Sequence, residues 1–256
     1  MSLRPPDRTA IPMSLVRASL EGAVHRGVPL RPLLRLAELS PDALDGDGWV
    51  ASEQFARLLQ AAGHTMRDEG VGFLERPIRP GSFSMMCHAT ISAPNLRRAL
   101  LRAARYWRLM REDLVIRPSE RGEECIMTIE FPGRDVPARY FVESFFVLLI
   151  RWASWMIDAN ILLNRTGFTF GPAAYADEYE FMFPGQHYFD QPVNFVAFSS
   201  RYLSMPVAQD TQTLSTFLAR APAGLLRQHR NDVSLMGQVR KMLSAAEPPA
   251  RGSDRA

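Results

Sequence analysis

The fold of this chain is decided by residues 92–131, which read SAPNLRRALLRAARYWRLMREDLVIRPSERGEECIMTIEF. In the first half, apolar residues recur every three or four positions, which predicts an amphipathic helix of about 17 residues packed on a flat surface. Ser92 is the expected N-cap, and Pro94 stands in the first turn, where its missing N–H costs nothing. The apolar positions are Leu96, Ala99, Leu100, Ala103, Trp107 and Met110.

The second half of this stretch predicts a β-hairpin. A short strand is expected over residues 114–117, and the tetrapeptide SERG at residues 119–122 is typical of a turn. Apolar residues then alternate with polar or smaller ones from Cys125 to Phe131, which indicates a strand with one buried face. The two strands are expected to pair antiparallel across the turn.

The predicted helix carries six arginines on its other faces. The whole chain holds 30 basic and 27 acidic residues, with a formal net charge of +3, and Lys241 is its one lysine. Opposite charges are mixed rather than gathered into runs, so charge gives little support to nucleic-acid binding. The arginine face is expected to meet solvent or a second subunit. The six residues are Arg97, Arg98, Arg102, Arg105, Arg108 and Arg111.

Outward from this stretch, the pattern divides the chain into successive parts. A helical lobe is expected over residues 13–75, an α/β part over 82–205 and C-terminal helices over 209–243, all within one domain. Residues 1–12 predict a disordered leader, and residues 244–256 form a polar tail rich in Pro and Gly.

The predicted fold class is α+β, with a helical N-terminal part and a small antiparallel sheet of about four strands covered by helices. The strands are expected at residues 114–117, 125–131, 168–170 and 193–198. A long, mostly buried helix is expected over residues 138–163. The residues just before the central helix, 84–89, are compatible with either helix or irregular structure.

The bulk composition sets the broad class. The chain has 256 residues, of which 46% are hydrophobic, so a sizeable core is expected and wholesale disorder is not. Cys87 and Cys125 lack CxxC spacing and are expected to be reduced, buried thiols. The most apolar segment, residues 141–163, is too polar for a membrane span, and no signal peptide is evident. Its interruptions are Glu143, Arg151, Asp158 and Asn160.

The sequence offers no catalytic or metal-binding motif. GxGxxG, Walker, GxSxG and HExxH patterns are absent, and no two histidines stand at ligand spacing. We therefore expect no enzyme activity, no metal and no cofactor.

Methionine and aromatic side chains cluster in the central helix, the long helix and the segment before them, and such residues can line an adaptable pocket for a small molecule. The competing interpretation is that they only fill the core. Arg105, Arg151 and Glu143 are further polar groups that could orient a ligand, although an Arg151–Glu143 ion pair inside the core is the structural alternative. The candidate ligand-binding residues are Met86, His88, Tyr106, Trp107, Met110, Phe145 and Trp152.

Two segments carry a family resemblance. Residues 83–116 read FSMMCHATISAPNLRRALLRAARYWRLMREDLVI, and residues 168–214 read FTFGPAAYADEYEFMFPGQHYFDQPVNFVAFSSRYLSMPVAQDTQTL. Together with the helical N-terminal third, they resemble the arabinose-binding-type sensory domain of AraC-type transcriptional regulators, in the ornithine-utilisation subgroup. The resemblance covers residues 15–243. Its strongest matches are residues 95–106 and Phe189, Pro192, Val193, Phe195, Tyr202, Leu203, Pro206 and Val207.

The resemblance implies a cytoplasmic regulator that uses residues 13–243 to bind a small, partly apolar effector and to form a homodimer. The effector is expected between the helices and the sheet. DNA would be bound only through a C-terminal helix-turn-helix domain that this chain does not contain, with residues 244–256 as the linker towards it.

One alternative is a haem- or cofactor-binding sensor of the haem–nitric-oxide type. It would need an axial ligand such as a histidine on an apolar helix face, and the pattern shows no convincing one.

Overall fold

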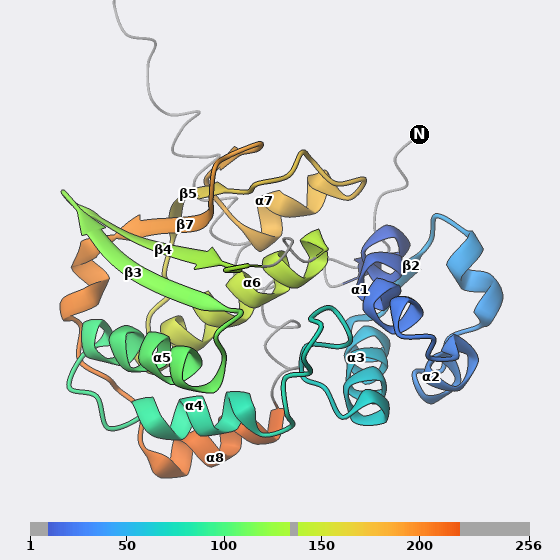
Figure 1. Ribbon diagram of the computed structural model, residues 1–256, viewed down its shortest axis with the longest axis horizontal. Helices are drawn as coiled ribbons and strands as arrows, with labels where there is room; N and C mark the ends of the chain where they lie inside the picture. Colours follow the sequence, from blue (N-terminus) through green and yellow to red (C-terminus); the bar gives the residue numbers. More distant parts are fainter. Residues whose placement is uncertain (1–9, 134–137, 221–256) are drawn as a thin grey trace, which may run out of the picture.

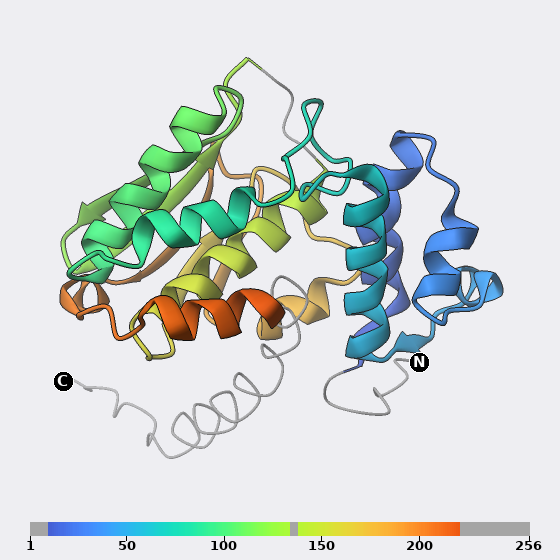
Figure 2. The same ribbon diagram turned by 90° about the horizontal axis from the view of Figure 1, so that it is seen from below.

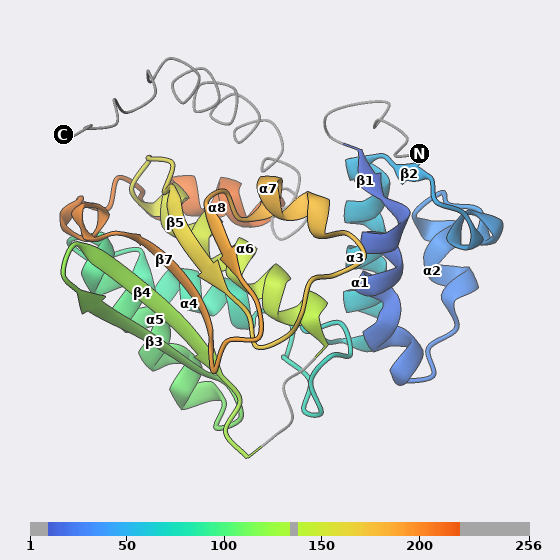
Figure 3. The same ribbon diagram turned by 90° about the horizontal axis from the view of Figure 1, so that it is seen from above.

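The computed structural model describes residues 10–133 and 138–220. They form a helical lobe at one end and a five-stranded sheet with helices on one of its faces at the other (Figure 1). Seen from above, the strands lie in front of these helices (Figure 3). The predicted α+β class is therefore confirmed.

The helical lobe begins with a pair of very short strands. β1 (Ile11–Pro12) pairs antiparallel with β2 (Trp49–Val50), and Ala10 and Ile11 are buried. The predicted disordered leader therefore extends too far, since its last three residues are packed; residues 1–9 lie outside the described part. The helices of the lobe are α1 (Met13–His25), α2 (Leu30–Leu36), the 3-10 helix η1 (Pro41–Asp45) and α3 (Ser52–Met66).

The sheet has the order β3-β4-β7-β5-β6, and all its pairs are antiparallel except β5–β6, which is parallel. The prediction of about four antiparallel strands therefore lacks one strand, and it did not include the parallel pair β5–β6 at one edge of the sheet. The strands are β3 (Val115–Arg121), β4 (Glu124–Glu130), β5 (Leu163–Gly167), β6 (Gln186–Tyr188) and β7 (Asn194–Ser199).

The predicted hairpin is confirmed. β3 and β4 pair over their whole length, and Gly122 turns the chain with a φ of +59°. Cys125, Met127 and Ile129 are buried on β4, as the alternation predicts. β3 forms one edge of the sheet and contains Pro118, a residue that sheets tolerate at edges because it has no N–H to donate.

The prediction of a strand at residues 168–170 is wrong. The strand in this region is β5, which ends at Gly167. Its residues LNRTG show no apolar alternation, and Gly167 leaves room for the Phe195 ring of the neighbouring strand. β6 was missed because its three residues are largely exposed and stand where a loop was expected. Apolar periodicity is weak in both strands, so it could not locate them.

The central helix is α5 (Leu96–Met110), which packs on α4 (Ser82–Thr90) and on β3. Its N-cap is Asn95, whose side-chain oxygen accepts a hydrogen bond from the Arg98 N–H at 3.0 Å. The expected N-cap, Ser92, instead accepts a hydrogen bond from the Arg102 guanidinium. The open choice for residues 84–89 resolves as helix.

Helix α6 (Arg139–Met156) is the long core helix, but it ends seven residues earlier than expected. Asp158, two residues after the end of the helix, takes a left-handed conformation with φ of +48°. The remaining elements are η2 (Ala176–Glu178), α7 (Tyr179–Met182), η3 (Ser200–Ser204) and α8 (Thr211–Arg220). The later part of the predicted C-terminal helices and the predicted linker lie outside the described residues.

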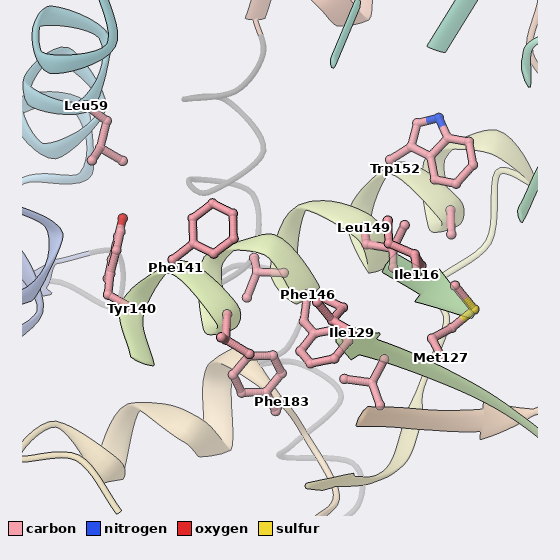
Figure 4. Close-up of a cluster of buried hydrophobic side chains, with 14 of the residues drawn as sticks. Leu59, Ile116, Met127, Ile129, Tyr140, Phe141, Phe146, Leu149, Trp152 and Phe183 are labelled. Atoms are coloured by element: carbon pink, nitrogen blue, oxygen red, sulfur yellow. The ribbon is translucent and has the colours of Figure 1, made fainter. Parts of the chain in front are cut away.

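Helices α4, α5, α6 and α8 lie beside one another beneath the sheet (Figure 2). No helix of residues 10–133 and 138–220 is long and apolar enough to cross a membrane. Between α6 and the sheet, side chains fill the space: Phe146 of α6 lies near Ile129 and other buried strand residues (Figure 4). This packing decides where a ligand could fit.

Candidate ligand-binding cavity

The structure contains a cavity of about 1140 Å³ between the helical lobe and the helices that cover the sheet. Its walls come from α3, the loop of residues 67–81, α4, α5, α6 and Leu218 of α8. None of its described lining residues belongs to a strand. The expected position between helices and sheet is therefore wrong for this cavity, because buried side chains occupy that layer. A volume of this size can accommodate a drug-sized molecule.

Aromatic side chains form much of the wall. Trp107 lies edge-on to Phe145, with ring centroids 5.6 Å apart, and Phe145 lies 5.9 Å from Phe141. The Trp107 indole N–H donates to the Met86 sulfur at 3.1 Å, so its polar atom is already engaged within the wall. The aromatic lining residues are Phe73, Phe83, Trp107, Tyr140, Phe141 and Phe145.

The loop of residues 67–81 is organised around one buried carboxylate. Asp68 is 2% exposed and accepts hydrogen bonds from the backbone N–H groups of Gly70, Gly72 and Ile78, at 2.8, 2.9 and 2.7 Å. Charge-assisted bonds of this kind are about twice as strong as neutral ones. Asp68 therefore fixes a wall of the cavity that has no regular secondary structure.

Two arginines hold this loop from opposite sides. Arg26, which follows α1, donates to the carbonyl oxygens of Leu74 and Glu75. Arg111, at the end of α5, is 7% exposed and donates to the carbonyl oxygens of Pro77 and Arg76 at 3.0 and 2.7 Å. The loop thus joins the helical lobe to the α/β part.

The same loop also approaches α1 very closely. A Cβ atom on Gly22 or on Gly72 would collide with the backbone of the other segment, and Gly72 has a φ of +82°. Only residues without a side chain permit this approach without a shift of the backbone.

Glu69 is the carboxylate that lines the cavity. Its two oxygens accept hydrogen bonds from the backbone N–H groups of Gly81 and Phe83, at 2.6 and 2.9 Å, at the start of α4. Burial raises the pKa of Glu69, and the two N–H donors oppose that rise. The group therefore stabilises the α4 N-terminus and also presents negative charge at the cavity.

Tyr140 brings a phenol group to the opposite wall. The residue is 5% exposed, and its hydroxyl points towards Leu59 of α3, which also lines the cavity (Figure 4). Within residues 10–133 and 138–220 this hydroxyl forms no hydrogen bond, and burial raises the pKa of Tyr140 above its ordinary value. Because Tyr140 lines the cavity, this hydroxyl is available for a hydrogen bond to a ligand.

Behind this wall, one turn further along α6, lies the fully buried Glu143. Its carboxylate accepts hydrogen bonds from the hydroxyls of Tyr175, at 2.8 Å, and Tyr179. Burial raises the pKa of Glu143 to about 7, although both tyrosines and the nearby Arg139 counteract the rise. Glu143 therefore fixes α6 to the segment of η2 and α7.

The structure brings three of the seven predicted ligand-binding residues into the lining: Met86, Trp107 and Phe145. The other four lie elsewhere. His88 and Met110 are exposed, Met110 to 49%.

Tyr106 is half-buried with its ring against Trp107, at 5.7 Å between centroids, and Trp152 is fully buried on α6 outside the lining. The Trp152 indole N–H has no hydrogen-bond partner among the described residues. Of the further polar candidates, the Arg105 side chain is exposed to solvent. Arg151 already interacts with another group of the protein, and neither residue lines the cavity.

The residues that shape the cavity most strongly were missed by sequence reasoning. Asp68 and Glu69 stand just before a segment expected to be only a loop, and Tyr140 stands at the start of a helix expected to be only core. The run DEGVG at residues 68–72 carries a signal that was available, because an Asp before glycines is typical of a side chain bonded to its own turn.

No metal site is formed within residues 10–133 and 138–220, where no group of three His, Cys, Asp or Glu side chains could hold an ion. A mostly apolar cavity with a few polar groups is instead typical of domains that bind small organic molecules.

Comparison with known proteins identifies the family. The chain belongs to the family described as the arabinose-binding domain of AraC transcription regulator, N-terminal, whose model matches residues 27–207. The predicted resemblance is thereby confirmed, and the haem-sensor alternative is not favoured.

A curated relative is the ornithine utilization regulator of Pseudomonas aeruginosa, which is 22% identical over 241 residues, covering 92% of this chain and 70% of the relative. Among solved structures, the transcriptional regulator CdpR from Pseudomonas aeruginosa aligns over 96% of this chain and 74% of its own, with 12% identity and a TM-score of 0.37.

Proposed function

We propose that this chain is the effector-sensing and dimerising part of an AraC-type transcriptional regulator, and that its effector binds in the cavity between the helical lobe and α4, α5 and α6. The observation that carries the proposal is the cavity itself, which lies almost wholly within the segment matched by the family. Met86, Trp107 and Phe145 are proposed as effector contacts. His88, Tyr106, Met110 and Trp152 are not retained, because they do not line the cavity.

The cavity is well placed for signalling. Its wall includes the loop held by Arg26 on one side and Arg111 on the other, so a ligand there touches both parts of the domain. A ligand that binds one arrangement of these parts more tightly shifts the population towards it. In a homodimer such a shift changes the geometry of attached DNA-binding domains, which act in the cytoplasm where the DNA is accessible.

The proposal is tested by filling the cavity. Ser84 is a lining residue on α4, and Ala89 is an exposed residue on the same helix. We expect the neutral apolar dye N-phenyl-1-naphthylamine to bind the unaltered chain. Ser84→Trp should weaken dye binding by about tenfold or more, because the indole occupies the cavity, whereas Ala89→Trp should leave it unchanged.

Fluorescence titration measures both affinities, and ornithine belongs in the first panel of competitors because a relative is named for its utilisation. Equal dye affinities in the two variants, or an unaltered chain that binds no dye, would overturn the proposal.

A further inference from the structure

We propose that the cavity takes an amphipathic amine, whose apolar body lies along the aromatic wall, whose ammonium group is bound by Glu69, and whose second polar group meets Tyr140. This inference rests on the proposed function and deepens it by naming the chemical class of the effector.

The charge of Glu69 is not balanced within the described part of the chain. Each carboxylate oxygen has capacity beyond the single backbone N–H that it accepts. Ion pairs formed among the described residues do not include Glu69. Arg67 and His64 also line the cavity and, like Glu69, are exposed residues, but no ion pair joins either of them to Glu69 within the described part of the chain. A ligand cation is therefore the natural counter-charge for Glu69.

The surroundings of that carboxylate also favour a cation. The lining is dominated by aromatic and aliphatic side chains, in which an ion pair is stronger than in water. An anionic amphiphile such as a fatty acid would bring a second negative charge to Glu69. The cavity should therefore distinguish amines from carboxylic acids that have the same apolar chain.

Tyr140 adds a preference that does not depend on charge. Tyr140 places an unpartnered hydroxyl in a mostly apolar wall, and the residue is 5% exposed. A site with such a group favours ligands that hydrogen-bond to it over ligands that leave it unpaired. The effector should thus carry a neutral polar group in addition to its amine.

The experiment uses three probes with one chain length: n-octylamine, 1-octanol and octanoate, each below its micelle concentration. Each probe competes with N-phenyl-1-naphthylamine on the full chain at pH 7. We expect octylamine to bind about tenfold more tightly than octanol, and octanoate more weakly than octanol. Glu69→Gln should remove the preference for the amine, whereas Glu112→Gln, at an exposed position, should keep it.

Tyr140 is tested with 8-amino-1-octanol. The ratio of its affinity to that of octylamine should fall in Tyr140→Phe, because that variant keeps the ring but loses the hydroxyl. An unchanged ratio would overturn the Tyr140 contact.

The outcomes separate the two proposals. If octanol and octylamine displace the dye equally well, or if octanoate binds best, the amine inference is wrong and the cavity remains a ligand site. If the dye binds but no probe displaces it, the amine inference alone fails; if the unaltered chain binds no dye, both proposals fail. The order of the three probes on the unaltered chain decides the matter even if Glu69→Gln does not fold.

Discussion

Glu143 shows what a single buried carboxyl group does to this molecule. Its folded-state pKa of about 7 lies above the ordinary value of 4.5, chiefly because burial disfavours the charged form. The folded state therefore holds this proton more strongly than the unfolded chain does. The resulting stability is fully present below pH 4.5 and is lost as the pH rises through 7.

We predict that Glu143→Gln makes the free energy of unfolding depend less on pH between 5 and 8. The difference between the two proteins should change by up to about 3 kcal/mol over that range, in the direction that favours the variant at high pH. Urea unfolding at several pH values measures it, with Glu112→Gln as the control. Parallel curves for Glu143→Gln and the unaltered chain would show that the buried carboxyl group is not the source.

Single residues also mark how far the sequence could predict the site. Met86, Trp107 and Phe145 were identified because methionine and aromatic residues at helical spacing stand out in a sequence. Asp68 and Glu69 were not, because their role depends on backbone N–H groups that lie close only after the loop folds. Long-range contacts of this kind leave no periodic trace.

Among the elements, helix α5 provides the sharpest test of local structure. Asn95 caps it through the Arg98 N–H, and Asn95 also forms an isolated bridge with Pro206. We predict that Asn95→Ala lowers the free energy of unfolding by about 1 kcal/mol, the usual cost of losing an N-cap. Ser92→Ala should have a smaller effect, because Ser92 is exposed and bonds only to the flexible Arg102. Chemical denaturation of both variants compares them directly; a larger loss for Ser92→Ala would restore the sequence-based assignment.

Strongly periodic elements could be predicted, and weakly periodic ones could not. Helix α5 and strand β4 each bury one face. Their apolar residues therefore recur at a regular spacing, every three or four positions in the helix and every second position in the strand. Strands β5 and β6 owe their position to pairing with neighbours, as in the register Thr166↔Val196 and Thr166↔His187. A strand specified by its partners rather than by its own pattern is accessible only once the sheet is known.

For the whole molecule, the junction of its two parts depends strongly on Arg111. It pairs with Asp113 at 2.7 Å and reaches two loop carbonyls while nearly buried. We predict that Arg111→Ala lowers the free energy of unfolding by about 3 kcal/mol, because Asp113 and both carbonyls lose their partner. Dye binding should weaken too, since the loop lines the cavity.

The control is Arg117→Ala, which removes an exposed arginine paired with Glu130 at 3.0 Å. Such pairs contribute about 0–1 kcal/mol, so stability and dye affinity should hardly change. Urea denaturation and fluorescence titration test both variants. Equal effects at the two positions would contradict the role given to Arg111.

The edge strand β3 has a consequence for how copies of this protein can associate. Pro118 cannot donate a hydrogen bond, and the exposed Arg117 and Arg121 place charge on the same rim of the sheet. Edges built in this way resist extension by a strand from another molecule, and they protect against aggregation. Two copies are therefore not expected to merge their sheets at β3, and the proposed homodimer should form through another surface.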